Sequence, residues 1–201
     1  RRDRSVTLPN PVAATLLARA LADPDEVAAD LLRPMPRRPV PAARLGTAFH
    51  AWVESRLGQQ SLLDPDDLPG AADDALVDVA DLEELKRAFA GGPYSDRSPI
   101  AVEVPFTVLV AGRVVTGRID AVFADGADYE VVDWKTGSAD HLDPTQLAIY
   151  RIAWAHRMQV PPDRVRAVFV LIATGEVVQP DTDDLVASLG ALGRPQLAEP
   201  G

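Results

Sequence analysis

Hydrophobic positions in the first half of the chain recur with the spacing of amphipathic helices. Residues 10–33 are rich in alanine and leucine at that spacing. Asp23-Pro24-Asp25 divides them into two helices, because aspartate caps a helix and proline is tolerated in its first turn. Four prolines in residues 34–43 predict an extended connector. Two further helices are predicted, from about Ala43 to Leu57 and from about Val77 to Ala90, with a surface loop between them.

From about residue 101 the hydrophobic pattern changes to the alternation that is typical of β-strands. Three strands joined by tight turns are predicted at Val102–Val110, Val114–Phe123 and Tyr129–Trp134. Pro105 cannot donate to a ladder, so the first of them is expected at a sheet edge or at a bulge. A helix from Asp143-Pro144 to Met158 follows, then an apolar strand at 165–173, a short strand at 176–178 and a last helix at 182–192. This order predicts an α/β fold, a mixed sheet flanked by helices.

Length and composition limit the class of protein. The chain has 201 residues and is 47% hydrophobic, which is enough for one core with a helical appendage. We expect residues 1–43 to form a helical extension with its connector and residues 44–201 to form the main domain. The start, Arg1-Arg2-Asp3-Arg4-Ser5, lacks a methionine and suggests a fragment of a longer chain. The absence of cysteine excludes a disulfide framework, a thiolate zinc site and an iron–sulfur cluster.

Charge and hydropathy restrict the partners. The chain shows neither a bilayer-spanning apolar run nor a signal-peptide pattern, so we expect a cytoplasmic protein with no membrane partner. Its formal net charge is −10, whereas tight electrostatic binding of DNA normally needs a basic surface. A nucleic-acid substrate would therefore be delivered by another part of a larger machine, or would meet a local cluster of arginines.

Two carboxylates and a lysine are the strongest candidates for chemistry. The hairpin at 117–135 brings Asp120 and Asp133 onto neighbouring strands, where they can hold a divalent cation. Lys135, one of only two lysines among twenty basic residues, shares the face of Asp133 because side chains alternate along a strand. This set suits metal-assisted phosphodiester cleavage. The alternative is an Asp120–Lys135 or Asp133–Arg118 ion pair at a sheet edge. Alternation places Arg118, Asp120 and Val122 on one face of their strand and Ile119, Ala121 and Phe123 on the other.

The helices add further candidates. His50 and Glu54 lie four residues apart on one helix face, with Gly46 one turn earlier leaving room for close approach. Imidazole is a good metal ligand, although an isolated histidine of this kind is more often structural. Gln146 and Tyr150, also four apart, can hydrogen-bond a phosphate or orient a site residue, or can simply pack on the sheet. On the first strand, Glu103 is a weaker candidate for an acid that supports the site.

These motifs occur in the order of a known family. Gly46-Thr47-Ala48-Phe49-His50 with Glu54, Gly117-Arg118-Ile119-Asp120, Asp133-Trp134-Lys135-Thr136-Gly137 and Gln146-x-x-x-Tyr150 together resemble the RecB-type nuclease domain of the PD-(D/E)xK superfamily, over residues 44–173. The resemblance implies a restriction-endonuclease-like αβββαβ core. The N-terminal helices and the proline connector are similar to the nuclease ends of actinobacterial AdnAB-type helicase–nuclease subunits, in which the domain follows a superfamily 1 motor.

The resemblance implies a role for each matching residue. His50, Asp120, Asp133 and the Trp134 carbonyl would bind Mg²⁺ or Mn²⁺. Lys135 would position the attacking water or stabilise charge on the phosphate. Gln146 and Tyr150 would contact the DNA strand or brace the site. Beside these, we take Arg118 and Glu54 as candidates for binding substrate or supporting the site.

The same resemblance implies an activity and a setting. We expect hydrolysis of single-stranded DNA during double-strand break processing, with a helicase motor in the same full-length chain and a second helicase–nuclease subunit as partners. The iron–sulfur cluster of some relatives does not carry over, and the chain has no Walker A motif for ATP. The alternative interpretations are a DNA-binding scaffold that has lost catalysis and a standalone nuclease.

Overall fold

The computed structural model describes residues 6–33, 41–58, 79–110 and 112–191. Its six helices are α1 (Ala14–Ala22), α2 (Pro24–Leu32), α3 (Pro41–Leu57), α4 (Val79–Ala90), α5 (Pro144–Met158) and α6 (Asp183–Ala191). Its six strands are β1 (Val12–Ala13), β2 (Ala101–Val110), β3 (Arg113–Asp125), β4 (Asp128–Lys135), β5 (Val165–Leu171) and β6 (Glu176–Val178). No helix of the described part has both the length and the apolar character needed to cross a bilayer. The loop predicted at 58–77 lies almost entirely outside the described residues.

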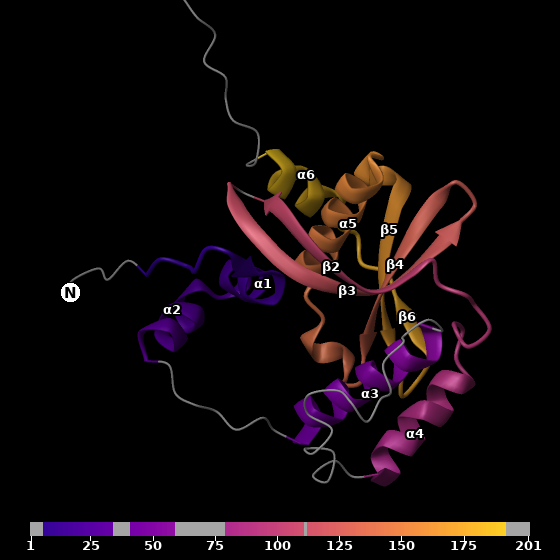
Figure 1. Ribbon diagram of the computed structural model, residues 1–201. Helices are drawn as coiled ribbons and strands as arrows, with labels where there is room; N and C mark the ends of the chain where they lie inside the picture. Colours follow the sequence, from indigo (N-terminus) through magenta and orange to yellow (C-terminus); the bar gives the residue numbers. More distant parts are fainter. Residues whose placement is uncertain (1–5, 34–40, 59–78, 111, 192–201) are drawn as a thin grey trace, which may run out of the picture.

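The strands form one mixed sheet in the order β1-β3-β4-β5-β6, with β2 paired to β3 (Figure 1). The β2–β3, β3–β4 and β5–β6 pairs are antiparallel, and the β1–β3 and β4–β5 pairs are parallel. Among the described strands, β2 pairs only with β3, as expected for a strand that carries Pro105. The observed order of helix, three antiparallel strands, helix and parallel strand confirms the predicted restriction-endonuclease-like α/β fold.

Helices cover both faces of the sheet. α1, α5 and α6 pack on one face, where the core includes Leu17, Leu147 and Leu189. α3 and α4 pack on the other, where Phe49 and Phe89 meet the sheet. Each such side chain stabilises the fold by roughly 1.5–3 kcal/mol relative to an exposed position. The site helices α3 and α5 are thus held on opposite faces of the same strands.

Capping residues set the helix boundaries that the sequence predicted. The Asp23 carboxylate accepts from the Glu26 N–H at the start of α2, and the Asp143 carboxylate accepts from the Thr145 N–H at the start of α5. Both helices then begin with proline, whose missing N–H costs nothing in the first turn.

The N-terminal segment contributes to the core of the domain. Val12 of β1 pairs with Val115 of β3, and Leu17 of α1 is buried against the sheet. α2 packs on α1. The domain boundary at residue 43 stays a prediction. β1 adds a strand to the sheet, and α1 packs on one of its faces.

Strand β3 departs from the predicted two-face alternation. Ile119 and Val122 both lie in the core on the α5 side, whereas Ala121 and Phe123 lie in the core on the α3 side. The expectation that Ile119, Ala121 and Phe123 share a face was therefore wrong. Along one edge of β3, β1 pairs as far as Thr116 and β4 pairs from Ala121 onward. The residues between them, including Asp120, have no partner strand on that edge, which leaves room for the strand to twist.

Candidate metal-dependent active site

The site forms where β3 and β4 separate. Their ladder ends at the pair Ala121 and Val132. Beyond it, the Trp134 N–H donates to Asp120 Oδ2 at 2.8 Å, so a side chain replaces the missing backbone acceptor. This contact holds a carboxylate that is only 8% exposed in the gap between the two strands.

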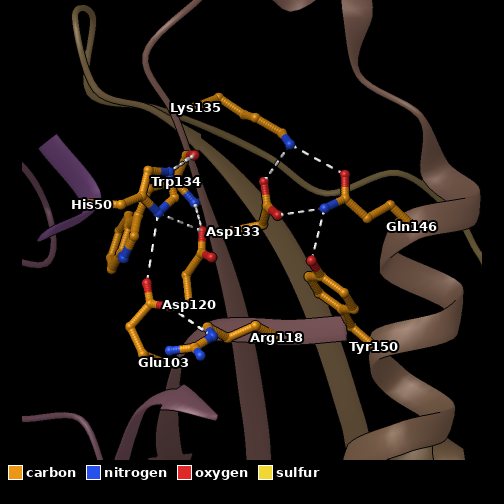
Figure 2. A network of polar contacts seen from close by, with 9 residues as sticks. All are labelled: His50, Glu103, Arg118, Asp120, Asp133, Trp134, Lys135, Gln146 and Tyr150. Carbon is orange, nitrogen blue, oxygen red and sulfur yellow. Dashed lines mark hydrogen bonds and ion pairs between the residues drawn. The ribbon is translucent and has the colours of Figure 1, made fainter. Parts of the chain in front are cut away.

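His50 reaches this gap from α3, which Phe49 and Val53 fasten to the sheet. Its Nε2 atom lies 3.2 Å from the Trp134 carbonyl oxygen. Because a carbonyl oxygen can only accept, Nε2 carries the proton that is donated. Nδ1 then faces Asp120 Oδ2 at 3.6 Å and Glu103 Oε1 at 3.7 Å (Figure 2). In the neutral ring, Nδ1 presents the lone pair that a metal ligand requires.

Glu103 enters the site through a local distortion of β2. Its neighbours Val102 and Val104 pair in register with Ala121 and Ile119. Glu103 itself has a φ of +48°, a left-handed conformation that is uncommon for a non-glycine residue. Such conformations cost free energy and concentrate at functional sites. Glu103 is predicted from the sequence only to support the site, whereas the structure places its carboxylate beside His50.

His50, Glu103 and Asp120 form a group that fits a divalent cation. Each offers one ligand atom, and these atoms lie within 4.8 Å of one another. One imidazole with carboxylate oxygens suits Mn²⁺, and the oxygens also suit Mg²⁺. Asp133 is buried nearby. A cation at this place would balance the charge of the two carboxylates, Glu103 and Asp120, that lie close together.

A second, fully connected network lies beside that group. Lys135 Nζ forms an ion pair with Asp133 Oδ2 at 2.7 Å and donates to Gln146 Oε1 at 3.1 Å. Gln146 Nε2 in turn donates to Asp133 Oδ1 and to the Tyr150 hydroxyl, both at 2.8 Å. The helix spacing of Gln146 and Tyr150 thus brings both to the strand end that carries Asp133 and Lys135 (Figure 2).

The ion pairs differ from those considered as the alternative interpretation. Lys135 pairs with Asp133 rather than Asp120, because their side chains project side by side at the end of β4. Arg118 lies beside Glu103, at 3.6 Å, rather than beside Asp133. Asp133 therefore takes part in the lysine network, while the three residues that crowd around the candidate cation position are His50, Glu103 and Asp120.

Burial and mutual repulsion shift the site's proton equilibria. Burial opposes the charged ring of His50, but Glu103, Asp120 and Asp133 outweigh it and raise the pKa of His50 to about 9. Burial, then repulsion from Asp133, raises the pKa of Asp120 to about 8. Burial also raises the pKa of Asp133, against the attraction of Lys135. The cluster thus retains protons at neutral pH that a cation would displace.

The remaining predicted residues lie around this centre. Arg118 is at the rim, with its side chain 57% exposed. Glu54 lies half-buried one turn beyond His50 on α3, and the described residues include no hydrogen bond or ion pair of its carboxylate. A Cβ added to Gly46 would come within 3.3 Å of Thr136 Oγ1, so α3 lies close to the end of β4 at this glycine. The roles of Glu54 and Arg118 stay predictions.

A buried acid cluster with a histidine and a lysine, at the point where two strands of an α/β fold separate, is typical of metal-dependent phosphodiesterases. The model of the PD-(D/E)XK nuclease superfamily matches residues 26–192. The chain belongs to that superfamily, whose members use divalent metals.

Solved structures support the fold. The crystal structure of the protein named "Putative exonuclease" from Eubacterium rectale superposes with a TM-score of 0.59 at 12% sequence identity, over 90% of this chain and 76% of that one. The crystal structure of SSO0001 superposes more loosely, with a TM-score of 0.42 at 17% identity, over 94% of this chain and 77% of that one. No curated protein matches the sequence.

Proposed function

We propose that this chain is a Mg²⁺- or Mn²⁺-dependent deoxyribonuclease domain that cleaves single-stranded DNA supplied by a linked helicase motor. The observation that supports it most is the juxtaposition of His50, Glu103 and Asp120 with the Asp133–Lys135 pair. Superfamily membership independently supports a hydrolytic nuclease.

The residues divide the chemistry between them. His50, Glu103 and Asp120 would hold the cation, with Asp133 and the Trp134 carbonyl as further candidate ligands. When bound there, the cation would polarise the scissile phosphate and make a water more acidic. Lys135 donates to the attacking water or to the phosphate oxygen on which negative charge develops.

Gln146 fixes the position of that lysine. It accepts from Lys135 and donates to Asp133, so the ammonium group is held at a defined place rather than moving freely in solvent. Tyr150 fixes Gln146 in the same way and is itself packed edge-on against Phe106. This support places the donor before substrate arrives, which lowers the reorganisation needed in the transition state.

Charge accounting explains how an acidic site receives an acidic substrate. Glu103, Asp120 and Asp133 are three acids, and Lys135 and Arg118 are two permanent cations at the same place. With the three carboxylates ionised and His50 neutral, the state that binds metal, these charges sum to −1, and a divalent cation raises the sum to +1. The cation therefore offsets the repulsion between the ionised carboxylates and a phosphate.

The helicase setting rests on the sequence. The order of the motifs and the N-terminal helices resemble AdnAB-type subunits, and a net charge of −10 favours delivery of DNA by another part of the molecule. In that setting the domain would trim DNA ends before recombination, alongside a second helicase–nuclease subunit. Hydrolysis would leave 5′-phosphate and 3′-hydroxyl ends.

The direct test is cleavage of labelled single-stranded DNA by this chain with Mn²⁺, with Mg²⁺ and with EDTA. We expect metal-dependent cutting by the wild type and none by Asp133→Ala, whose fold is checked by circular dichroism. Full activity in a folded Asp133→Ala variant would overturn the proposal. Absence of both cutting and calorimetric Mn²⁺ binding in the wild type would favour an inactive scaffold.

A further inference from the structure

Arg118 differs from the other cations of the site because most of its donors are unused. Within the described parts of the chain, its guanidinium has one recorded partner, Glu103 Oε2, at 3.6 Å from Nε and beyond hydrogen-bond reach. Lys135, by contrast, has two partners and is 28% exposed. An arginine side chain that is 57% exposed therefore presents a fork of N–H donors to solvent at the rim of the cluster.

The position of this fork follows from the two oxygens of Glu103. One oxygen, Oε1, faces His50, and the other, Oε2, faces Arg118 (Figure 2). Glu103 thus separates the cation position from the guanidinium by the width of one carboxylate. A phosphodiester held at the cation position would extend its neighbouring phosphate over this rim.

Occupation of the site changes the balance of the Arg118 pair. Without a cation, Glu103 is the nearest anion and attracts the guanidinium. With a divalent cation beside Oε1, most of that negative charge is neutralised, and the attraction of Arg118 to Glu103 weakens. A planar guanidinium then pairs better with a phosphate, which it can contact through two parallel N–H groups.

We infer that Arg118 is a substrate-binding residue that contacts the phosphate adjacent to the scissile one. The inference rests on the proposed nuclease function, and it assigns the strand a path across the site from the Lys135 end of β4 over Glu103 to Arg118. Arg118 exchanges its carboxylate partner for a phosphate when the loaded site receives DNA.

The test compares Arg118→Gln with Arg113→Gln. Both remove one positive charge from β3, and Arg113 lies five residues away, or roughly 17 Å along the strand. Binding of a labelled oligothymidylate is measured at several salt concentrations, with Ca²⁺ in place of Mn²⁺ to limit cleavage. Mn²⁺ affinity of each variant is measured separately by calorimetry.

We expect Arg118→Gln to weaken oligothymidylate binding about tenfold. Its slope of log affinity against log salt should fall by about 0.7, the value for one lost contact to single-stranded phosphate. Arg113→Gln should keep the wild-type slope, and Mn²⁺ affinity should stay unchanged in both. Arg118→Lys should keep the slope and lose part of the affinity, because an ammonium cannot make the forked contact.

Two results would overturn the inference. Equal slopes in the wild type and Arg118→Gln would show that the guanidinium touches no phosphate. A drop in Mn²⁺ affinity in Arg118→Gln, with rescue by Arg118→Lys, would show that Arg118 acts by orienting Glu103 instead. Failure of the wild type to bind Mn²⁺ would contradict the proposed function, and this is a separate measurement.

Discussion

Strand β4 carries two buried acids, one towards each end, and their surroundings differ. Glu130 is 4% exposed and meets two guanidinium groups, Arg97 at 2.5 Å and Arg166 at 2.7 Å. Asp133, three residues later and 3% exposed, has one cationic partner, Lys135, and accepts one further hydrogen bond from the Gln146 amide. Its neighbour Asp120 is held by one backbone N–H.

This contrast separates a structural acid from a functional one. A buried carboxylate with two cationic partners is satisfied, so it helps to fix the fold and needs no ligand. Buried carboxylates that crowd together repel one another and cost free energy, an arrangement that is typical of functional sites. The two ends of β4 therefore predict opposite responses to the same kind of substitution.

The largest expected effect is the loss of cleavage in Asp133→Ala. Removing this carboxylate takes away a candidate cation ligand and releases Lys135, so the rate should fall on the order of a thousandfold or more. Steady-state cleavage of labelled single-stranded DNA measures it. Glu130→Gln serves as the control at the other end of the strand, and it should cut at nearly the wild-type rate once folded.

The next effect is on the free energy of unfolding, which should fall when the structural acid is replaced and not when the functional acid is. Glu130→Gln leaves two arginines without their shared partner and should lower the free energy of unfolding by about 2 kcal/mol, less than a fully buried pair because the guanidinium groups are partly exposed. Asp120→Asn keeps the acceptor for the Trp134 N–H, so without cation its free energy of unfolding should not fall. Urea denaturation measures both, and an equal loss in the two variants would contradict the comparison.

The pH dependence of cation binding tests the candidate cation site and not the structural acid Glu130. The pKa of His50 is raised from 6.5 to about 9, so the folded chain without cation holds a proton that the unfolded chain releases above pH 6.5. The associated stability is fully present below that pH and is lost as pH rises through 9. The raised pKa of Asp120 acts in the same direction, from 3.8 to about 8.

Because a cation displaces these protons, Mn²⁺ affinity should rise with pH by about tenfold per unit between pH 6.5 and 8 for each proton released. Calorimetric titrations in buffers of different ionisation enthalpy count the protons directly. The Glu130→Gln variant should show the same rise. An affinity independent of pH would mean that the His50 cluster does not bind the cation.

The smallest effect concerns the approach of α3 to β4. In Gly46→Ala, the new methyl group meets Thr136 Oγ1 at 3.3 Å and moves His50 slightly away from its partners. Mn²⁺ affinity should fall only about twofold to threefold, within the usual range for small packing changes. The double variant Gly46→Ala with Thr136→Ala removes the close contact and should recover the wild-type affinity. If the Mn²⁺ affinity does not recover, the contact with Thr136 is not the cause of the loss.

Local chemistry explains which features the sequence could predict. Asp23-Pro24 and Asp143-Pro144 locate two helix starts because capping depends on neighbouring residues. The Asp-x-Lys motif on β4 predicts its own geometry through strand alternation, and the observed Asp133–Lys135 pair follows from it. The order of the elements sufficed for the fold class.

Features set by tertiary contacts could not be predicted in the same way. The left-handed backbone of Glu103 has no local signal, so its central place beside His50 was underestimated. The break in the alternation of β3 falls between Ile119 and Ala121, whose partners in β2 flank the left-handed Glu103, and no pattern in β3 itself records it. Val12 and Ala13 are too short a run to predict a strand from their own sequence.

We propose above all that the group of His50, Glu103 and Asp120 holds the divalent cation. Calorimetric titration of Mn²⁺ into the wild type, Glu103→Gln and Glu130→Gln tests it most directly, because the two variants make the same substitution at a functional and a structural acid. We expect clear binding to the wild type and to Glu130→Gln, with strong loss in Glu103→Gln. Equal binding by all three proteins, or loss in Glu130→Gln alone, would contradict it.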